Sequence, residues 1–394
     1  MKSIIIPKDF DGLRDRVMRT IAPIKCADTN TKADKNFLFI AKGSNSGRQL
    51  PAHYLVYFLL VDLLCFENLG RWEKIAWSIP IDLDGHAYLI EYRKFGLDIF
   101  AHDPTLEATE VARIVTLINK GVRTAEPFFK WIANRAASES KLNVRNKATE
   151  LYFRFDYLRG LYKTSIESIE VEDSQKRAAG RVTLTDYCEQ NGMPRFYTHR
   201  EVSWLAIAVI EAFYSWTEHI FILIAILQGT ITTAEQVSAL ALSDWSEKFR
   251  NALGISDRST KVHYDALLTI KRQIRNVVAH GAFGKEGQAF DFHSSAGAVP
   301  VSFDLERRKT KYNLGPGLVI DDGDAMAAID GFIAHLRTGP SRLALLYVQD
   351  GGLDVILPMA ADGTYASAMK SERAMRDLVT KLCRQADTSA NMDF

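Results

Sequence analysis

Three residues suited to phosphate chemistry stand close together in the segment IKRQIRNVVAHG, residues 270–281. They are Arg275, Asn276 and His280. An arginine guanidinium grips phosphate oxygens with a planar fork of N–H donors. A histidine changes its charge near neutral pH and therefore serves as a general acid or a general base. The combination favours acid–base chemistry on a phosphodiester.

The surrounding residues predict a helix that positions these side chains. Apolar residues recur at helical spacing and form one buried stripe, which consists of Leu267, Ile270, Ile274, Val277 and Val278. Arg272, Asn276 and His280 follow one another along one face of this helix, and we expect Arg272 to support the site. Arg275 lies about a quarter turn away. Gly281 is a typical helix stop, so His280 falls in the last turn, where the helix dipole favours imidazolium.

The sequence RNVVAH, followed by glycine, resembles the R-N-x-x-x-H signature of HEPN-domain ribonucleases. Two other segments, RQLPAH at Arg48–His53 and RSTKVH at Arg258–His263, fit the looser spacing but have no asparagine after the arginine. Members of the family resemble small up-down helical bundles with the motif near the end of a late helix. The resemblance therefore implies such a bundle over residues 198–285.

The resemblance also implies an activity. In the family, two such helices usually meet across a homodimer and form one composite site that cleaves RNA without a metal or a cofactor. The ribose 2′-hydroxyl attacks the adjacent phosphate and leaves a 2′,3′-cyclic phosphate, which excludes DNA as the substrate. Carried over, His280 is the acid or base, Arg275 clamps the phosphate and Asn276 orients the phosphate or His280. Toxins of the family that pair with a nucleotidyltransferase antitoxin often continue H-x-Y, and Ala282 stands at that tyrosine position here.

Residues 204–227 are apolar over a length that would also span a membrane. Glu211 and Glu218 lie near the middle, and an ionised carboxylate at the bilayer centre costs roughly 2.5–3.5 kcal/mol. The segment is therefore predicted to be a buried helix of the bundle rather than a membrane span. The two carboxylates share one face of this helix. Either could hold Arg275 across the bundle, with Glu218 preferred as a supporting residue, or both could reach solvent at the bundle edge.

One or two shorter helices are expected between this long helix and the motif helix. The segment TTAEQVSALALSDWSEKFRNALGI, residues 232–255, has their composition. Thr232 or Thr233 is the expected N-cap, and Gly254 is the expected stop.

The N-terminal part of the chain predicts both helices and strands. A helix over residues 53–70 precedes two β-rich runs that are joined by Asp84 and Gly85. This dipeptide predicts a hairpin, and the run LDIFA would extend it into a meander. Helical patterns then cover about 105–137 and 141–168.

The remaining segments complete the expected organisation. The polar stretch 172–181 is a candidate linker, and after residue 281 come strand-like runs such as LALLYVQDGGLDVILP, followed by a last helix over about 364–386. The predicted fold class is mixed α+β and multi-domain, with a central all-α, HEPN-like up-down bundle flanked by α/β regions. The expected divisions are a mixed N-terminal region, the helical domain and a small C-terminal α/β region, at residues 1–195, 196–286 and 287–394.

The stretch 121–165 is locally basic and aromatic. Nine lysines and arginines stand against four acidic residues, and the interleaved aromatic residues include Tyr152, Phe153, Phe155, Tyr157 and Tyr162. One interpretation is an RNA surface with stacking rings. The alternative, which we prefer, is an amphipathic helix with its aromatic side chains in the core and its charges in solvent.

The composition limits the class of protein. The chain carries 49 lysines and arginines against 48 acidic residues, so any nucleic-acid surface must be a local patch. Its four scattered cysteines fit a reducing cytosol better than a disulfide framework or a zinc ribbon. We therefore expect a cytoplasmic protein that is free of the membrane. The resemblance to HEPN ribonucleases implies a toxin-like endoribonuclease of stress or antiphage defence, with a regulatory partner left open. The alternative is a non-catalytic HEPN module for RNA binding or protein assembly.

Overall fold

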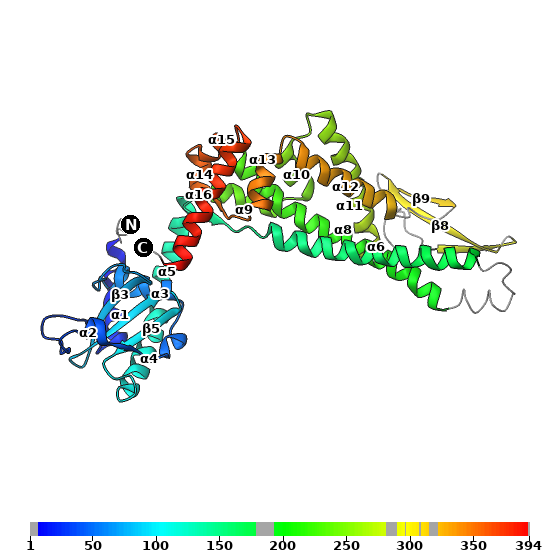
Figure 1. Cartoon of the computed structure of the whole chain (residues 1–394). Helices are drawn as coiled ribbons and strands as arrows, with labels where there is room; N and C mark the ends of the chain where they lie inside the picture. Colours follow the sequence, from blue (N-terminus) through cyan, green and yellow to red (C-terminus); the bar gives the residue numbers. More distant parts are fainter. Residues whose placement is uncertain are drawn as a thin grey trace. The chain divides into compact units, whose positions relative to one another are not determined.

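The computed structural model describes residues 7–178, 193–280, 290–295, 297–306, 309–314 and 322–392. The chain divides into two compact units, whose elements are labelled in Figure 1. Unit 1 combines Met1–Glu139 with Thr380–Phe394, and unit 2 consists of Ser140–Val379. Both units contain helices and antiparallel strands, so the predicted mixture of α and β structure is confirmed.

Unit 1 is built on a five-stranded antiparallel sheet in the order β1-β3-β4-β5-β2. The strands are β1 (Lys25–Cys26), β2 (Lys42–Gly43), β3 (Ile75–Leu83), β4 (His86–Arg93) and β5 (Gly96–Ala101). Asp84 and Gly85 join β3 to β4 with φ values of 54° and 87°, as a two-residue hairpin turn requires. The predicted hairpin and its extension into a meander are therefore confirmed.

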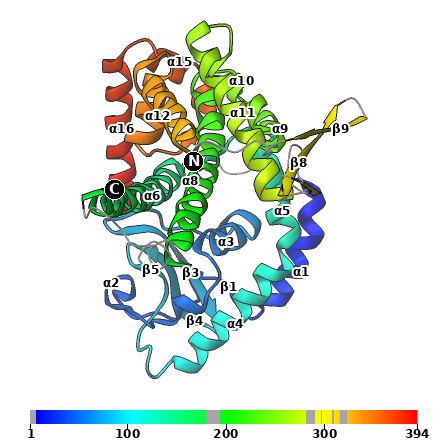
Figure 2. The same cartoon turned by 90° about the vertical axis from the view of Figure 1, so that its right-hand side faces the viewer.

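The two faces of this sheet are covered differently (Figure 2). The larger core includes Ile79 and Ile90 of the sheet, and its helices are α1 (Asp11–Ile21), α3 (His53–Tyr57), the π-helix η3 (Phe58–Leu63), α4 (Ala108–Thr124) and α5 (Glu126–Ser138). On the other face, Leu89 and Phe100 pack with Phe37 of α2 (Phe37–Ile40). Two 3-10 turns, η1 (Lys8–Phe10) and η2 (Ser46–Gln49), complete the unit.

The helix predicted over residues 53–70 is shorter than expected. It ends with η3 at Leu63, and Cys65 turns the chain with a φ of 59°. Leu69 then donates its backbone N–H to the carbonyl of Ser78 at 2.9 Å. The end of the apolar run therefore pairs with β3, which satisfies backbone groups that a longer helix would have paired internally.

The last residues of the chain complete unit 1. Helix α16 (Glu372–Asn391) begins in unit 2 and ends in unit 1. The Lys74 N–H donates to the carbonyl of Met392 at 3.1 Å, and the Lys94 ammonium donates to the side-chain oxygen of Asn391 at 3.0 Å. The C-terminal tail is thus fixed to residues that directly precede β3 and directly follow β4.

Unit 2 is mainly helical. Two long helices, α6 (Ala148–Ala178) and α8 (Met193–Leu227), run side by side (Figure 1 and Figure 2). The unit also contains α9 (Ala234–Leu242), α10 (Trp245–Leu253), α11 (Arg258–His280), α12 (Asp322–Thr338), α13 (Arg342–Leu345), the π-helix η5 (Leu346–Asp350), α14 (Leu357–Ala361) and α15 (Thr364–Ala368). One antiparallel pair joins β6 (Asn143–Val144) to β10 (Val355–Ile356), and a separate antiparallel sheet consists of β7 (Phe290–Ser294), β8 (Gly297–Glu306) and β9 (Lys309–Leu314).

Helix α8 is the central helix of unit 2. Its Phe213 and Trp216 are buried and pack against Phe155 of α6, and Phe213 also contacts Phe332 of α12. Residues Glu201–Leu227 are long and apolar enough to cross a membrane by length and composition alone. In the structure 61% of the most apolar window of this segment is buried inside the protein, as in a core helix.

The division into units differs from the three expected regions, 1–195, 196–286 and 287–394. Helices α6 and α12 were expected in the flanking regions, but both pack on α8 and belong to the same compact unit as the bundle helices. Residues 172–178 of the expected linker continue α6 instead. The run LALLYVQDGGLDVILP was expected to be strand-like, but most of it is helical. Its apolar residues are buried in α13 and η5, and only two residues form the strand β10.

Candidate functional site

Helix α11 carries the R-N-x-x-x-H sequence. It is continuous from Arg258 to His280, as the apolar stripe predicts, and the buried members of that stripe include Leu267, Ile270 and Ile274. At its start the Asp257 carboxylate accepts the backbone N–H of Thr260 at 3.0 Å and caps the helix.

The three predicted catalytic residues occupy the last turns of α11. The side chains of Arg275, Asn276 and His280 lie outside the described part of the structure, as does Gly281, the expected stop. The predicted helix is therefore confirmed, and the arrangement of the three side chains stays a prediction. Lys271, whose side chain is described, precedes Arg275 by one helical turn and occupies the same side of α11.

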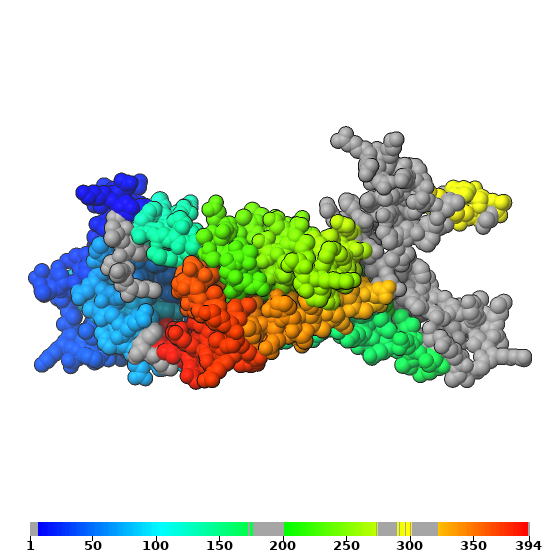
Figure 3. Space-filling model, turned by 90° about the horizontal axis from the view of Figure 1, so that it is seen from above, coloured from blue at the N-terminus to red at the C-terminus, as the bar shows by residue number. Residues whose placement is uncertain are grey.

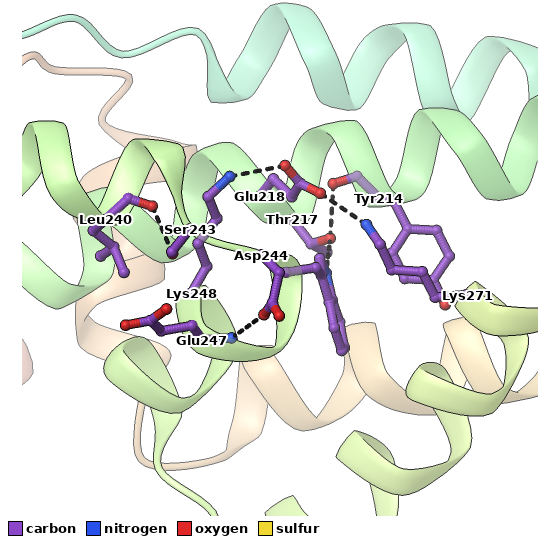
Figure 4. Close-up of polar contacts among 10 residues, drawn as sticks. Tyr214, Thr217, Glu218, Leu240, Ser243, Asp244, Glu247, Lys248 and Lys271 are labelled. Atoms are coloured by element: carbon purple, nitrogen blue, oxygen red, sulfur yellow. Dashed lines mark hydrogen bonds and ion pairs between the residues drawn. The ribbon is translucent and has the colours of Figure 1, made fainter. Parts of the chain in front are cut away.

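Glu218 of α8 joins α10 and α11 through two ion pairs (Figure 4). Its Oε1 accepts from the Lys271 ammonium at 2.8 Å, and its Oε2 accepts from the Lys248 ammonium at 2.9 Å. The Lys248 side chain is 7% exposed, whereas those of Glu218 and Lys271 are about one-third exposed. A charge as buried as that of Lys248 requires a partner. Glu218 therefore links α8 to α10 and α11 through lysines, and its expected contact with Arg275 stays a prediction, because the Arg275 side chain lies outside the described part of the structure.

Two aromatic side chains surround the Lys271 ammonium. Its nitrogen lies 4.7 Å from the ring centre of Tyr214 and 5.8 Å from that of Trp245, within cation–π range. The Tyr214 hydroxyl donates to the carbonyl of Leu267 in α11 at 2.6 Å. Trp245 donates its indole N–H to the hydroxyl of Thr217 at 3.0 Å. We call Glu218, Lys248, Lys271, Tyr214 and Trp245 the Glu218 cluster.

The protonation states in the Glu218 cluster follow from burial and charge. Burial raises the pKa of the Glu218 carboxyl, but the hydrogen bonds and charges of Lys271 and Lys248 outweigh this and hold the pKa below its ordinary value. Glu218 is therefore ionised at neutral pH. Burial raises the pKa of the Tyr214 phenol, which stays protonated and keeps its hydrogen bond to α11.

Local sequence signals position Lys248 in this cluster. Helix α9 begins at a capping box in which Thr233 and Gln236 bond reciprocally. Of the two expected N-caps, Thr232 and Thr233, the structure therefore confirms Thr233. Asp244 caps α10 by accepting the Glu247 N–H at 2.8 Å. The expected stop at Gly254 is also confirmed, with a φ of 66° that glycine adopts without strain.

The structure distinguishes Glu218 from Glu211. Glu218 is ion-paired and its side chain is 35% exposed, whereas Glu211 on the same helix is exposed. Of the two carboxylates, Glu218 therefore reaches solvent only in part. Arg272, a predicted supporting residue, is exposed on α11 beside the half-buried Lys271.

The two looser matches to the motif place their histidines in packing contacts. His53 stacks on Tyr92 with ring centres 3.9 Å apart. His263 lies against His335 and Phe332, with ring centres 4.9 Å and 5.9 Å away. Burial, followed by the charge of His335, lowers the pKa of His263. Both histidines are therefore held by neighbouring rings within the protein.

The basic stretch 121–165, which ends in α6, agrees only in part with the preferred alternative of an amphipathic helix. Phe155 is fully buried, and Arg159 pairs with Asp330 of α12 at 2.7 Å. Phe153 and Tyr157 depart from the expectation, because their side chains are exposed. Aromatic side chains of α6 are therefore found both in the core and in solvent, and Arg159 makes an ion pair within unit 2.

Sequence reasoning missed Lys248 and Lys271. A signal for Lys248 exists, because it lies between Trp245 and Phe249 on the apolar side of α10. A lysine on a buried face demands a carboxylate partner, and Glu211 and Glu218 of α8 are the natural candidates. The choice between Glu211 and Glu218 needs the crossing of the helices, which the sequence does not show.

The described residues contain no group of three or more His, Cys, Asp or Glu side chains arranged to hold a metal ion. Comparisons of the chain with protein-family profiles, with curated proteins and with solved structures each returned no match. Function is therefore inferred from the residues of this chain alone. Arg275, Asn276 and His280 lie at the end of α11, and the lysine–carboxylate network of Glu218 contacts α11 at Lys271, one turn before Arg275.

Proposed function

We propose that the protein is a metal-independent endoribonuclease of the HEPN type, with Arg275, Asn276 and His280 as its catalytic residues. The observation that supports this most directly is the continuous helix α11, which ends in the R-N-x-x-x-H sequence. Along the chain, the long helix α8 and the shorter helices α9 and α10 precede α11, and this order is compatible with the proposal.

The proposed reaction is transesterification within RNA. A general base removes the proton of the ribose 2′-hydroxyl, whose oxygen then attacks the adjacent phosphorus. The bond from phosphorus to the 5′-oxygen breaks, and a general acid protonates that oxygen. The products are a 2′,3′-cyclic phosphate end and a 5′-hydroxyl end.

Each catalytic residue has a role in this reaction. His280 transfers protons, Arg275 stabilises the negative charge that grows on the phosphorane, and Asn276 orients the phosphate or His280. Arg272 adds positive charge on the exposed side of α11. Glu218 fixes the preceding turn of α11 through Lys271, which limits the movement of the site.

One motif supplies one histidine, whereas the reaction needs an acid and a base. A homodimer through the helical domain would supply both, because a two-fold axis brings two copies of α11 together. In this proposal the protein works in the cytoplasm, unattached to a membrane, as a toxin-like effector of stress or antiphage defence. The alternative proposal is a HEPN module that binds RNA or assembles with a partner without cleavage.

The test compares two histidine-to-alanine variants on a fluorescent RNA library. His280→Ala should lower the cleavage rate by at least about a hundredfold, the lower end for loss of a general acid or base. His293→Ala changes an exposed histidine on β7 and should cleave like the wild type. Circular dichroism establishes that both variants are folded.

The outcomes separate the two proposals. Cleavage by the wild type with loss in His280→Ala supports the enzyme. Full activity in folded His280→Ala protein excludes the catalytic assignment. RNA binding by a wild type that never cleaves any member of the library supports the non-catalytic module.

A further inference from the structure

A second group of cationic side chains lines a cavity on another side of unit 2. The cavity has a volume of about 280 Å³ and lies where α12, α13, η5 and α16 meet. Arg337 comes from α12, Arg342 from α13 and Arg376 from α16. The surfaces of α12 and α16 adjoin on the side of the molecule seen in Figure 3. Three arginines from three helices therefore converge on one hollow.

Glu372 bridges two of these arginines. Its Oε1 accepts from the Arg376 guanidinium at 2.7 Å and 2.9 Å, and its Oε2 pairs with Arg342 at 2.7 Å. The hydrogen bonds of Arg376 and Arg342 hold the pKa of the Glu372 carboxyl below its ordinary value, so it is ionised at neutral pH. The Glu372 carboxylate thus lies between two guanidiniums, in a position where they could bind an external anion instead.

The charges around the cavity do not cancel. Arg337 donates to the neutral hydroxyl of Tyr152 at 3.3 Å, and among the described residues no carboxylate lies within ion-pair distance of it. Asp350 and Glu372 are the two acidic residues of the lining, against three arginines. The lining therefore keeps an excess of one positive charge. Each guanidinium also has five N–H groups, so donors remain after the contacts described.

Gln349 adds a neutral donor to the same lining. Its Oε1 accepts the indole N–H of the buried Trp216 at 3.0 Å. An indole nitrogen can only donate, so this bond fixes which end of the amide is the oxygen. The amide nitrogen is the end left for the cavity, where it can donate to a ligand. The site is thus dominated by hydrogen-bond donors.

We infer that this cavity binds the dianionic phosphate of a small phosphate monoester or free inorganic phosphate. Such a ligand must displace the Glu372 carboxylate from Arg342 and Arg376. A phosphate dianion brings three or more acceptor oxygens and two charges, whereas a carboxylate brings two oxygens and one charge. Arginine forks match this geometry. The volume lies just below the roughly 300–1,000 Å³ of sites for drug-sized ligands, so the ligand is small.

The test is isothermal titration of the full chain with four probes at constant ionic strength. The probes are inorganic phosphate, ribose 5-phosphate, a nucleoside 5′-monophosphate and acetate. Saturable binding of the phosphates without binding of acetate is expected. Binding of inorganic phosphate alone identifies free phosphate as the ligand source, and stronger binding of an ester identifies an organic phosphate.

Four variants locate the binding. Arg342→Ala and Arg376→Ala should each weaken binding by about tenfold or more, as loss of a charge-assisted hydrogen bond predicts. Arg373→Ala is the matched control, because its side chain is 93% exposed on the same helix and should leave affinity unchanged. Glu372→Gln removes the competing charge and should bind phosphate more tightly than the wild type.

Phosphate could instead bind at the end of α11, so Arg275→Ala is measured beside these variants. Loss of binding in Arg275→Ala with no loss in Arg342→Ala or Arg376→Ala overturns the inference. Absence of saturable phosphate binding by the folded wild type overturns it as well. This titration does not require RNA cleavage, so its result is independent of the proposed function.

Discussion

Replacement of Glu218 by glutamine tests whether the Glu218 cluster stabilises the bundle. The variant keeps the shape of the side chain and one acceptor oxygen, but it leaves Lys248 without a counter-charge. Removal of one partner of a buried ion pair costs about 3–5 kcal/mol. Glu218 and Lys271 are each about one-third exposed, so water screens part of this loss. We therefore expect a loss of about 1–3 kcal/mol in the free energy of unfolding.

For a domain of this size each kcal/mol corresponds to about 2–4 °C, so the Tm should fall by roughly 2–12 °C. Glu211→Gln is the matched control, because the same change is made at an exposed position of the same helix. Hydrogen exchange followed by mass spectrometry locates the effect. Peptides of α8, α10 and α11 should lose protection in Glu218→Gln, whereas those of the β3–β4 hairpin in unit 1 should not change.

The pH dependence gives a second measurement. The pKa of Glu218 is lower in the folded protein than its ordinary value of 4.5, so its contribution is present above that value. The contribution is lost as the pH falls through the folded pKa. The stability difference between wild type and Glu218→Gln should therefore narrow below about pH 4.5. Equal melting of Glu218→Gln and Glu211→Gln, or a difference that does not narrow in acid, would refute this account of Lys248.

Two further predictions concern the proposed cleavage. Activity should persist in excess EDTA and leave 2′,3′-cyclic phosphate ends, since the proposed proton transfers use only His280 and its copy in a second chain. Strict dependence of cleavage on a divalent ion, or products with 3′-hydroxyl ends, would assign cleavage to another site. Specific activity should fall when the protein is diluted below its dimer dissociation constant, and a mixture of Arg275→Ala and His280→Ala chains should recover at most partial activity. Full specific activity in a protein that analytical ultracentrifugation shows to be a monomer would contradict a composite site.

Local patterns predicted much of the secondary structure correctly. The Asp84-Gly85 hairpin, the Thr233 cap and the stop at Gly254 depend on the conformations of a few adjacent residues. Helix α11 was predictable because its apolar stripe is regular. Such features are set within one turn of chain, so their signals are present in the sequence itself.

Long-range packing explains what was not predicted. An apolar run such as Leu345–Val348 is buried whether it is a strand or a helix, so its composition does not distinguish the two. The sequence favoured Glu218 over Glu211 as a supporting residue but did not show its partners, and the crossing of α8, α10 and α11 pairs Glu218 with two lysines. The unit boundaries depend in the same way on contacts of α6 and α12 with α8.

The position of unit 2 within the chain has a consequence for synthesis on the ribosome. Ser140–Val379 interrupts unit 1, whose last piece includes the tail that bonds to Lys74 and Lys94. At about 5–20 residues per second, that tail follows the N-terminal piece by roughly ten to fifty seconds. Unit 2 emerges as one uninterrupted segment, whereas the nascent sheet of unit 1 waits for its tail. The end of the β3–β4 pair that bonds to this tail therefore stays without these hydrogen bonds until residues 391 and 392 have been synthesised.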